Sequence, residues 1–259
     1  MESKSTMKRA RWGFMGVALA MTLAARGVWA QCCGDCNGDG AVTVDEVLTA
    51  VNHALTSCSD DGICRPERLP ASGQTTAYGA GSDGDVRAGA TLAYTDNGDG
   101  TITDHNTGLT WEKKDDSGGI HDKDNVYTWG MGFPPFTMNG TMVTEFLATL
   151  NTQPCFADHC DWRVPNVREL QSIVDYEIEH AGPMVQPVFH NAAGCTECTD
   201  VMLASCSCTA SSPTTFYWSS TTFRFTPGYA WGVYFDSGFV HNRAPKDVPS
   251  YVRAVRGGV

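Results

Sequence analysis

The residues best suited to chemistry lie near the start of the chain, between positions 35 and 46. This segment reads DCNGDGAVTVDE and fits the calcium-loop pattern D-x-[DN]-x-[DN]-G-x5-E at every specified position. Calcium prefers about six to eight oxygen ligands, and this spacing wraps them around one point. The pattern predicts Ca2+ ligands at Asp35, Asn37, Asp39, Ala41 through its carbonyl, Thr43 directly or through water, and Glu46.

A predicted helix follows the loop, because residues 45–55 place Val47, Leu48, Val51 and Leu55 on one face. A calcium loop followed by a helix resembles half of a dockerin repeat or a single EF-hand. This resemblance implies a small calcium-binding module over residues 31–64. The alternative is a Gly/Asp-rich turn that holds no metal, and the position of Glu46 favours calcium over it.

A second calcium loop is incomplete. Residues 95–106 read TDNGDGTITDHN, but Thr95 and Asn106 stand at the two ends where carboxylates are needed. We expect a hairpin turn in this segment. Dockerins and EF-hands normally work in pairs, so a lone module suggests a calcium-stabilised spacer more than a partner-binding device.

The 11 cysteines fall into three groups. Cys155 and Cys160 are close enough to form a local disulfide. The second group, between residues 195 and 208, has C-x2-C and C-x-C spacing, which could hold zinc. In an exported chain disulfides are favoured instead, and the sequence does not determine how these cysteines pair. This second group lies in an insert over residues 191–213, a candidate recognition loop. The groups outside the Cys155/Cys160 pair are Cys195, Cys198, Cys206 and Cys208 in the insert, and Cys32, Cys33, Cys36, Cys58 and Cys64 in the calcium module.

Catalytic patterns are missing from the sequence. The seven histidines form no H-E-x-x-H pattern, and there is no G-x-S-x-G nucleophile elbow or P-loop. Two carboxylate pairs could suggest glycoside hydrolysis, but both fit a solvated surface better. These pairs are Asp115 with Asp116 and Glu177 with Glu179. We therefore expect no enzyme activity, with an unrecognised hydrolase as the weakest alternative.

Residues 1–30 have the features of a signal peptide. A basic segment at 7–12 precedes a short apolar segment at 13–25, and we place the cleavage after Ala30. The alternative is an uncleaved anchor. Cleavage removes five basic residues and one acidic residue, which takes the net charge from -11 to about -15. The expected product is exported, whether secreted, periplasmic or at the cell surface, with no stable membrane span and no nucleic-acid partner.

The remaining sequence predicts an α+β fold. Residues 65–93 read as a linker or extended edge, and residues 94–259 as the main domain. Asn166 and Glu169 have the spacing of a capping box at the start of the best predicted helix. The expected elements are strands at 101–104, 108–113, 216–222, 229–235 and 251–257, and helices at 144–151 and 166–178.

Five sequence strings carry a resemblance to a known family. In chain order they are YTDNGDGTITDHNTGLTWEKK, DWRVPNVRELQSIVDY, YWSST, AWGVYFDSG and YVRAVRGG. Together they look like the Lcl C-terminal domain family, named for a collagen-like bacterial surface adhesin, with the match beginning near residue 69. The WRVPNVREL and VRAVRG strings are also similar to the C-type-lectin-like fold of formylglycine-generating enzymes. That oxidase chemistry would need cysteines near the carboxyl end, and none follows Cys208.

The resemblance implies a lectin-like domain of short twisted antiparallel strands and two helices that binds an extracellular glycan or protein. Sulfated polysaccharide is one implied ligand, although a strongly acidic chain would repel a polyanion unless its basic residues cluster. The alternative is a structural cell-envelope component without a specific ligand. The sequence does not fix the oligomeric state.

The candidate ligand-binding residues lie on and after a loop between two predicted strands. The loop at 223–229 carries three aromatic side chains and a cation, a composition that suits recognition from a rigid scaffold. The same loop could instead fold its aromatic side chains inward. The candidates are Phe223, Arg224, Phe225 and Tyr229, with His241, Asn242 and Arg243 expected nearby.

Overall fold

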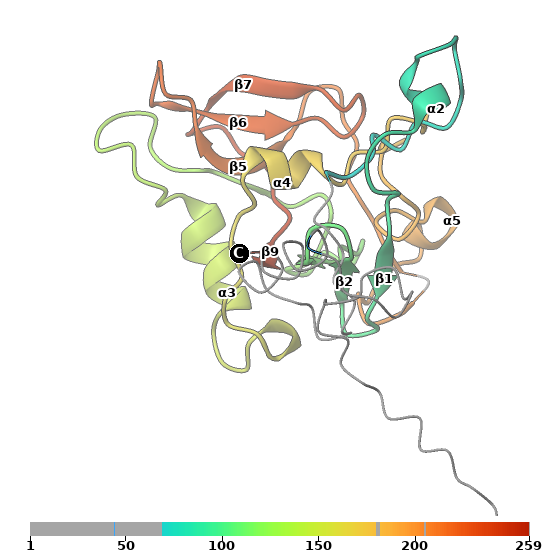
Figure 1. Cartoon of the computed structure of the whole chain (residues 1–259). Coiled ribbons are helices and arrows are strands. Elements are labelled where there is room, and N and C mark those ends of the chain that lie inside the picture. The colour runs from blue at the N-terminus through green and yellow to red at the C-terminus, as the bar shows by residue number, and fades with distance from the viewer. Residues whose placement is uncertain (1–43, 45–68, 180–181, 205, 259) are drawn as a thin grey trace, which may run out of the picture.

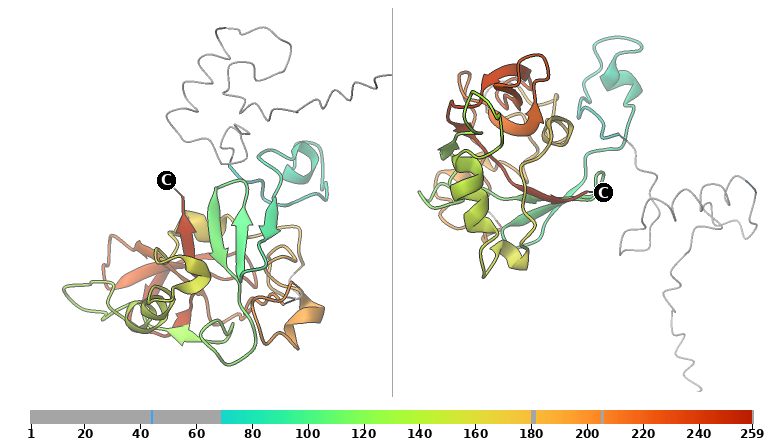
Figure 2. Two further views of the ribbon diagram at one scale, coloured as in Figure 1. Left: turned by 90° about the horizontal axis from the view of Figure 1, so that it is seen from below. Right: turned by 90° about the vertical axis from the view of Figure 1, so that its left-hand side faces the viewer.

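Two β-sheets form the framework of the domain (Figures 1 and 2). The computed structural model describes residue 44 and residues 69–179, 182–204 and 206–258. In the four-stranded sheet every neighbouring pair is antiparallel. Its spatial order is β1 (Tyr94–Asp96), β2 (Thr101–Asp104), β3 (Leu109–Glu112) and β9 (Val255–Gly257).

The second sheet has five strands and one parallel pair, β5 with β8. Its spatial order is β4 (Val126–Tyr127), β8 (Ser250–Tyr251), β5 (Tyr217–Thr222), β6 (Tyr229–Val233) and β7 (Val240–Pro245). The predicted strand at 251–257 is therefore divided. The chain leaves the five-stranded sheet after Tyr251 and joins the other sheet at Val255, so these residues connect the two sheets.

The helices are short. The predicted helix at 144–151 lies within a π-helix that continues into α3, and the predicted helix at 166–178 ends early, at Gln171. It ends there because the backbone that follows pairs elsewhere: Val174 bridges Val185, and Asp175 N donates to Met184 O. The helices are α2 (Asp83–Val86), the π-helix (Met142–Leu147), α3 (Ala148–Leu150), a 3-10 turn (Phe156–Asp158), α4 (Val167–Gln171) and α5 (Ala192–Cys195).

The five-stranded sheet carries a hydrophobic cluster on each face, because successive strand residues point to opposite sides. Tyr217 packs with β2, β3 and α4, whereas its neighbours Phe216 and Trp218 pack with the π-helix and α3. Trp162 and Trp218 are both buried. In Figure 1, α4 lies beside β5 and β6, and both strands contact it.

Residues 69–93 form an arm that leaves the domain and returns to it, which is the projecting segment that carries α2 in Figure 1. A short parallel bridge closes its base, where Ala71 N donates to Ala90 O over 2.8 Å. The carboxylate of Glu177 holds the arm by accepting from Thr75 N at 2.7 Å and Thr76 N at 3.0 Å. The arm is thus attached to the main domain by specific hydrogen bonds.

Three disulfides join all six cysteines in the described part of the chain. Cys155 pairs with Cys160, as the sequence predicts. In the insert, the Cys198–Cys206 disulfide is nested inside the Cys195–Cys208 disulfide. Sulfur atoms in disulfides cannot serve as thiolate ligands, so the structure does not support zinc at this cluster.

The signal peptide and the calcium module lie outside the described residues, apart from Val44. The same holds for all six predicted Ca2+ ligands, Asp35, Asn37, Asp39, Ala41, Thr43 and Glu46. Within the described ranges, no helix combines the length and the apolar character that a bilayer crossing requires.

Candidate functional site

The residues of the WRVPNVREL string connect α4 to the last strand through hydrogen bonds. Asn166 and Glu169 form the predicted capping box: the Asn166 side chain accepts from Glu169 N, and the Glu169 side chain accepts from Asn166 N. Arg163 makes two hydrogen bonds of 2.8 Å to the Glu169 carboxylate and one of 2.9 Å to Gly257 O. Burial alone would raise the pKa of Glu169, but the bonds from Arg163 and Asn166 outweigh it and lower that pKa. The string therefore ties α4 to the last strand.

A buried charge network lies at the centre of the domain. Glu112 Oε1 lies 3.0 Å from Lys114 Nζ and 2.8 Å from His121 Nδ1, while Oε2 accepts from Ala254 N over 2.9 Å. Arg253, which is fully buried, donates to Glu112 O over 2.8 Å. Burial would raise the pKa of Glu112, but the neighbouring Lys114 and His121 outweigh it and lower that pKa. The Glu112 carboxylate thus compensates the cations around it.

The same Arg253 side chain reaches the insert. Its Nη2 donates to Cys208 O over 2.8 Å and to Thr209 Oγ1 over 2.7 Å. Arg253 belongs to the VRAVRG string, so the residues that carry the resemblance at this end of the chain are also structural. The insert is docked on the framework by a second contact, in which Cys208 N donates to Lys114 O.

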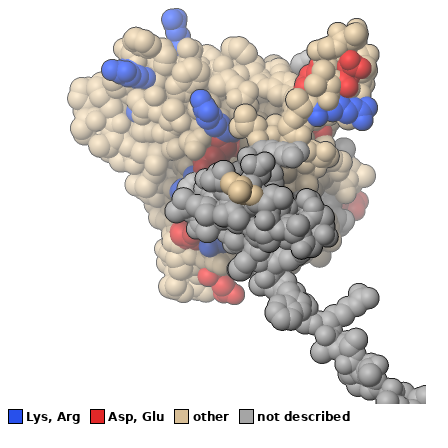
Figure 3. All heavy atoms as spheres, viewed as in Figure 1, with Lys and Arg blue, Asp and Glu red and all other residues tan. Residues whose placement is uncertain are grey.

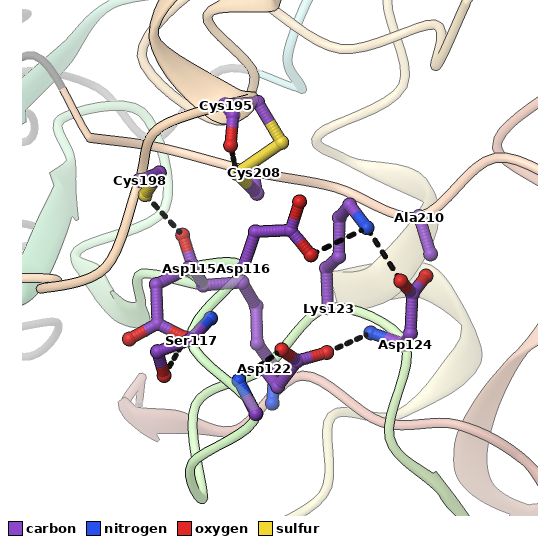
Figure 4. A network of polar contacts seen from close by, with 12 residues as sticks. Asp115, Asp116, Ser117, Asp122, Lys123, Asp124, Cys195, Cys198, Cys208 and Ala210 are labelled. Atoms are coloured by element: carbon purple, nitrogen blue, oxygen red, sulfur yellow. Dashed lines mark hydrogen bonds and ion pairs between the residues drawn. A yellow bond between two sulfur atoms is a disulfide. The ribbon is translucent and has the colours of Figure 1, made fainter.

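An acidic cluster lies next to the insert (Figure 4). One carboxylate oxygen from each of Asp116, Asp122 and Asp124 lies within 4.8 Å of the others, which would suit a cation. However, Lys123 Nζ already bridges two of them, at 3.0 Å from Asp116 and 2.5 Å from Asp124. Asp122 instead accepts from Gly118 N and Asp124 N. The Lys123 ammonium thus pairs with two of the three carboxylates, and the third accepts backbone hydrogen bonds.

In each of the two carboxylate pairs considered for hydrolysis, one carboxylate accepts hydrogen bonds that shape the fold. Asp115 is buried rather than solvated, because its carboxylate accepts from Ser117 N and Ser117 Oγ and shapes the turn. Glu177 holds the arm, as described above.

Three loops meet at one end of the five-stranded sheet, and we call them the three-loop corner: residues 130–139, 223–228 and 246–249. Lys246 N donates to Gly228 O over 3.0 Å, which joins the second loop to the third. The first loop lies against both: a Cβ on Gly228 would come within 2.6 Å of Gly132 O, and one on Gly132 within 3.4 Å of Asp247 Oδ1. These contacts require glycine at Gly228.

Each loop of the corner exposes apolar side chains. Phe225 is 88% exposed and Phe133 is 60% exposed, and both Met131 and Val248 are also exposed. Large apolar side chains gathered in loops and left in solvent are a mark of a binding surface. Arg224 and Asp247 are the exposed charged residues that these three loops contribute.

Beneath the corner lies a fully buried lysine, Lys246. Its Nζ lies 3.5 Å from the centre of the Trp129 ring and donates to Thr222 Oγ1 over 2.9 Å and to Phe136 O over 3.2 Å. Its backbone also takes part, because Trp129 N and Gly130 N both donate to Lys246 O. Burial lowers the pKa of Lys246 to about 8.

The structure divides the predicted ligand-binding residues between two places. Phe223, Arg224, Phe225 and Tyr229 lie in or beside the corner. Phe223 packs with its ring 5.9 Å from that of Trp231, whereas Phe225 is exposed to solvent.

His241 lies towards the other end of the sheet, opposite Gly232, whereas Tyr229 pairs with Pro245. Its ring is 5.9 Å from Phe216, 5.8 Å from Tyr234 and 6.2 Å from Phe239. The register shifts next to it, and Asn242 and Arg243 lie at this irregularity between the two ends. The structure therefore does not bring His241 to the loop that carries Phe225.

Sequence reasoning missed the first loop of the corner. The segment 130–139 reads GMGFPPFTMN, a run without charge that combines Gly and Pro with Phe and Met. Such a composition could have indicated an apolar loop. Its place beside the other two loops depends on contacts between distant segments, which no local pattern contains. In Figures 1 and 2 this loop, coloured yellow-green after β4, lies beside the orange end of the sheet.

Comparison with known proteins gives one match. The family model described as the Lcl C-terminal domain matches residues 100–256. This range covers more than half of the chain and contains both sheets from β2 onward, the insert and all three loops of the corner. No curated protein and no solved structure matches the chain.

Proposed function

Because the chain belongs to the Lcl C-terminal domain family, we propose that it is an exported, non-catalytic binding or adhesion protein that uses the three-loop corner to recognise an extracellular glycan or surface protein. In this proposal the main domain has a lectin-like fold. A fold by itself does not determine function, so the argument rests on the site.

One observation carries the proposal: the family strings and the corner have different uses. Arg163, Trp218 and Arg253, which belong to the strings, are bonded or buried in the framework. The corner instead leaves Phe133 and Phe225 largely exposed to solvent. Recognition by loops on a rigid scaffold fits this division.

Charge around the corner supports recognition rather than repulsion of a ligand. The exposed charged residues on the three loops and on β7 are two cations, Arg224 and Arg243, and one carboxylate, Asp247, although the net charge of the chain is -11. On the face shown in Figure 3, blue side chains without red ones stand over the β5–β7 sheet. An acidic protein can therefore offer a ligand a surface that is apolar and weakly basic.

The segments before residue 69 complete the proposal from sequence alone. We infer a signal peptide at 1–30 and a module at 31–64 that binds Ca2+ through the loop ending at Glu46. Carboxylate and carbonyl oxygens are the ligands that Ca2+ prefers, and the pattern supplies them at the required spacing. Calcium in this module would stabilise the N-terminal part and leave recognition to the corner.

Retention of the mature chain on a glycan array and a panel of extracellular matrix proteins tests the proposal. We expect wild type to be retained on at least one surface and Phe133→Ser/Phe225→Ser to be lost from it. Phe239→Ser is the matched control, because Phe239 is 59% exposed and lies in the turn at the opposite end of β6. Equal loss in both variants would remove the corner from the site, and no retention of wild type would favour a structural envelope role.

A further inference from the structure

We propose that Lys246 is a positioning residue whose buried ammonium group locks the loops of the three-loop corner in their binding conformation. That the locked conformation is the one that binds a ligand rests on the proposed function. The lock itself is a property of the loops and can be measured without a ligand.

The geometry of Lys246 connects the segments that form the corner. Its ammonium reaches Phe136 O in the first loop and Thr222 Oγ1 directly before the second, while its own backbone begins the third. An ammonium group has three N–H donors. Two are used in these hydrogen bonds, and the group lies 3.5 Å from the Trp129 ring centre, a distance that suits a cation–π interaction.

Among the described residues, the contacts of this ammonium are a carbonyl, a hydroxyl and an aromatic ring, with no carboxylate. Residues 128–140, which cover one side of the ammonium, contain no ionisable side chain. The second loop adds only Arg224 and the third only Asp247, both exposed, and the Asp247 carboxylate lies towards Gly132. Arg243 on β7 is exposed as well. Burial accordingly lowers the pKa of Lys246, to about 8.

A buried, unpaired charge is normally unfavourable, and an apolar side chain of similar length is often as stable or more stable in its place. Global stability is therefore a poor explanation for a lysine at this position. What methionine could not supply is the pair of hydrogen bonds to Phe136 O and Thr222 Oγ1. The ammonium thus uses two of its N–H donors to hold the conformation of the loops.

Hydrogen exchange of Lys246→Met tests the lock. We expect amides in 130–139 and 222–229 to exchange about tenfold faster than in wild type, since local opening no longer breaks two charge-assisted bonds. The melting temperature should stay the same or rise. The matched control is Lys114→Met, which also removes a buried ammonium: it should lower the melting temperature and affect these loops only through global unfolding.

A titration of wild type covers the case in which Lys246→Met does not fold. In an NMR experiment on 13C-lysine protein, the Cε signal of Lys246 should titrate with a midpoint near 8, and the protection of both loops should fall over the same range. In Lys246→Arg, which keeps a positive charge at higher pH, one lysine Cε signal is lost, and this loss assigns the signal to Lys246. A midpoint near that of an exposed lysine, or unchanged loop exchange in Lys246→Met, would overturn the lock.

The two proposals fail separately. Unchanged loop exchange would reject the lock and leave the array result for Phe133 and Phe225 intact. Absence of any retained ligand would reject the proposed function and leave the exchange result standing.

Discussion

Lys114 and Lys246 are both buried, but their surroundings differ in one respect. Lys114 Nζ lies 3.0 Å from the carboxylate of Glu112, and its charge is compensated. In the part of the chain that the structure describes, the Lys246 ammonium contacts a carbonyl, a hydroxyl and an aromatic ring. The first lysine belongs to the framework that joins the two sheets and the insert. The second contacts the loops of the three-loop corner, which we propose bind a ligand. The contrast is thus between a lysine of the framework and a lysine of the proposed binding site.

Removal of the Glu112 carboxylate should have the largest effect. Glu112→Gln leaves Lys114 and Arg253 buried without a compensating charge, and breaking a buried pair in this way typically destabilises a protein by about 3–5 kcal/mol. Urea unfolding followed by circular dichroism measures the change. Asp116→Asn, at an exposed loop, is the control and should stay within about 0.5 kcal/mol. Similar stability of both variants would show that the network is not part of the framework.

The two lysine variants should differ in the sign or size of their effect. Lys114→Met leaves Glu112 with His121 as its nearest partner, and we expect a loss of about 2–3 kcal/mol, because a buried carboxylate loses part of its compensation. Lys246→Met should lose less than about 0.5 kcal/mol or gain stability. Thermal unfolding of both variants and of wild type at pH 7 measures the two changes in the free energy of unfolding. Equal losses would contradict the contrast between the two sites.

The pH dependence of stability should also distinguish Lys246. Burial lowers its pKa to about 8 from 10.5, so the unfolded state binds more protons between these values and stability rises with pH there. Compared with Lys246→Met, wild type should gain about 2 kcal/mol between pH 8 and 9.5. The comparison with the variant cancels the buried tyrosines, whose raised pKa values act in the opposite direction near pH 10. A constant difference between the two proteins would refute the burial of a titrating ammonium.

The smallest effect should be confined to the arm at 69–93. Hydrogen bonds from the side chain and backbone of Thr76 and from the backbone of Thr75 lower the pKa of Glu177 to about 2, so the attachment is present above pH 4.5 and is lost as the pH falls towards 2. Glu177→Gln should release the arm at neutral pH without changing the corner. Limited proteolysis within 69–93 measures the release, and Glu179→Gln is the control. Cleavage at the same rate in all three proteins would show that Glu177 does not hold the arm.

Local patterns predicted the framework well. The hairpin of β2 and β3, the turn before Thr101, the Asn166–Glu169 capping box and the Cys155–Cys160 disulfide each depend on residues close in sequence. β7 was missed because VHNRAP is polar and contains proline, and it is held at the sheet edge by pairing with β6. The corner was only partly predicted because Lys246, Thr222 and Phe136 meet through long-range packing. The contrast between the framework and the three-loop corner could therefore not be predicted from sequence patterns.

The affinity of the mature chain for a ligand retained on the array is the most direct test of the central claim, that recognition lies in the corner and not in the framework. Isothermal titration should show at least about a tenfold weaker Kd for Phe133→Ser/Phe225→Ser, since two central apolar contacts are lost, with Phe239→Ser within about twofold of wild type. Melting temperatures should agree among the three proteins. An unchanged Kd for the double variant, or an equal loss for Phe239→Ser, would contradict the account.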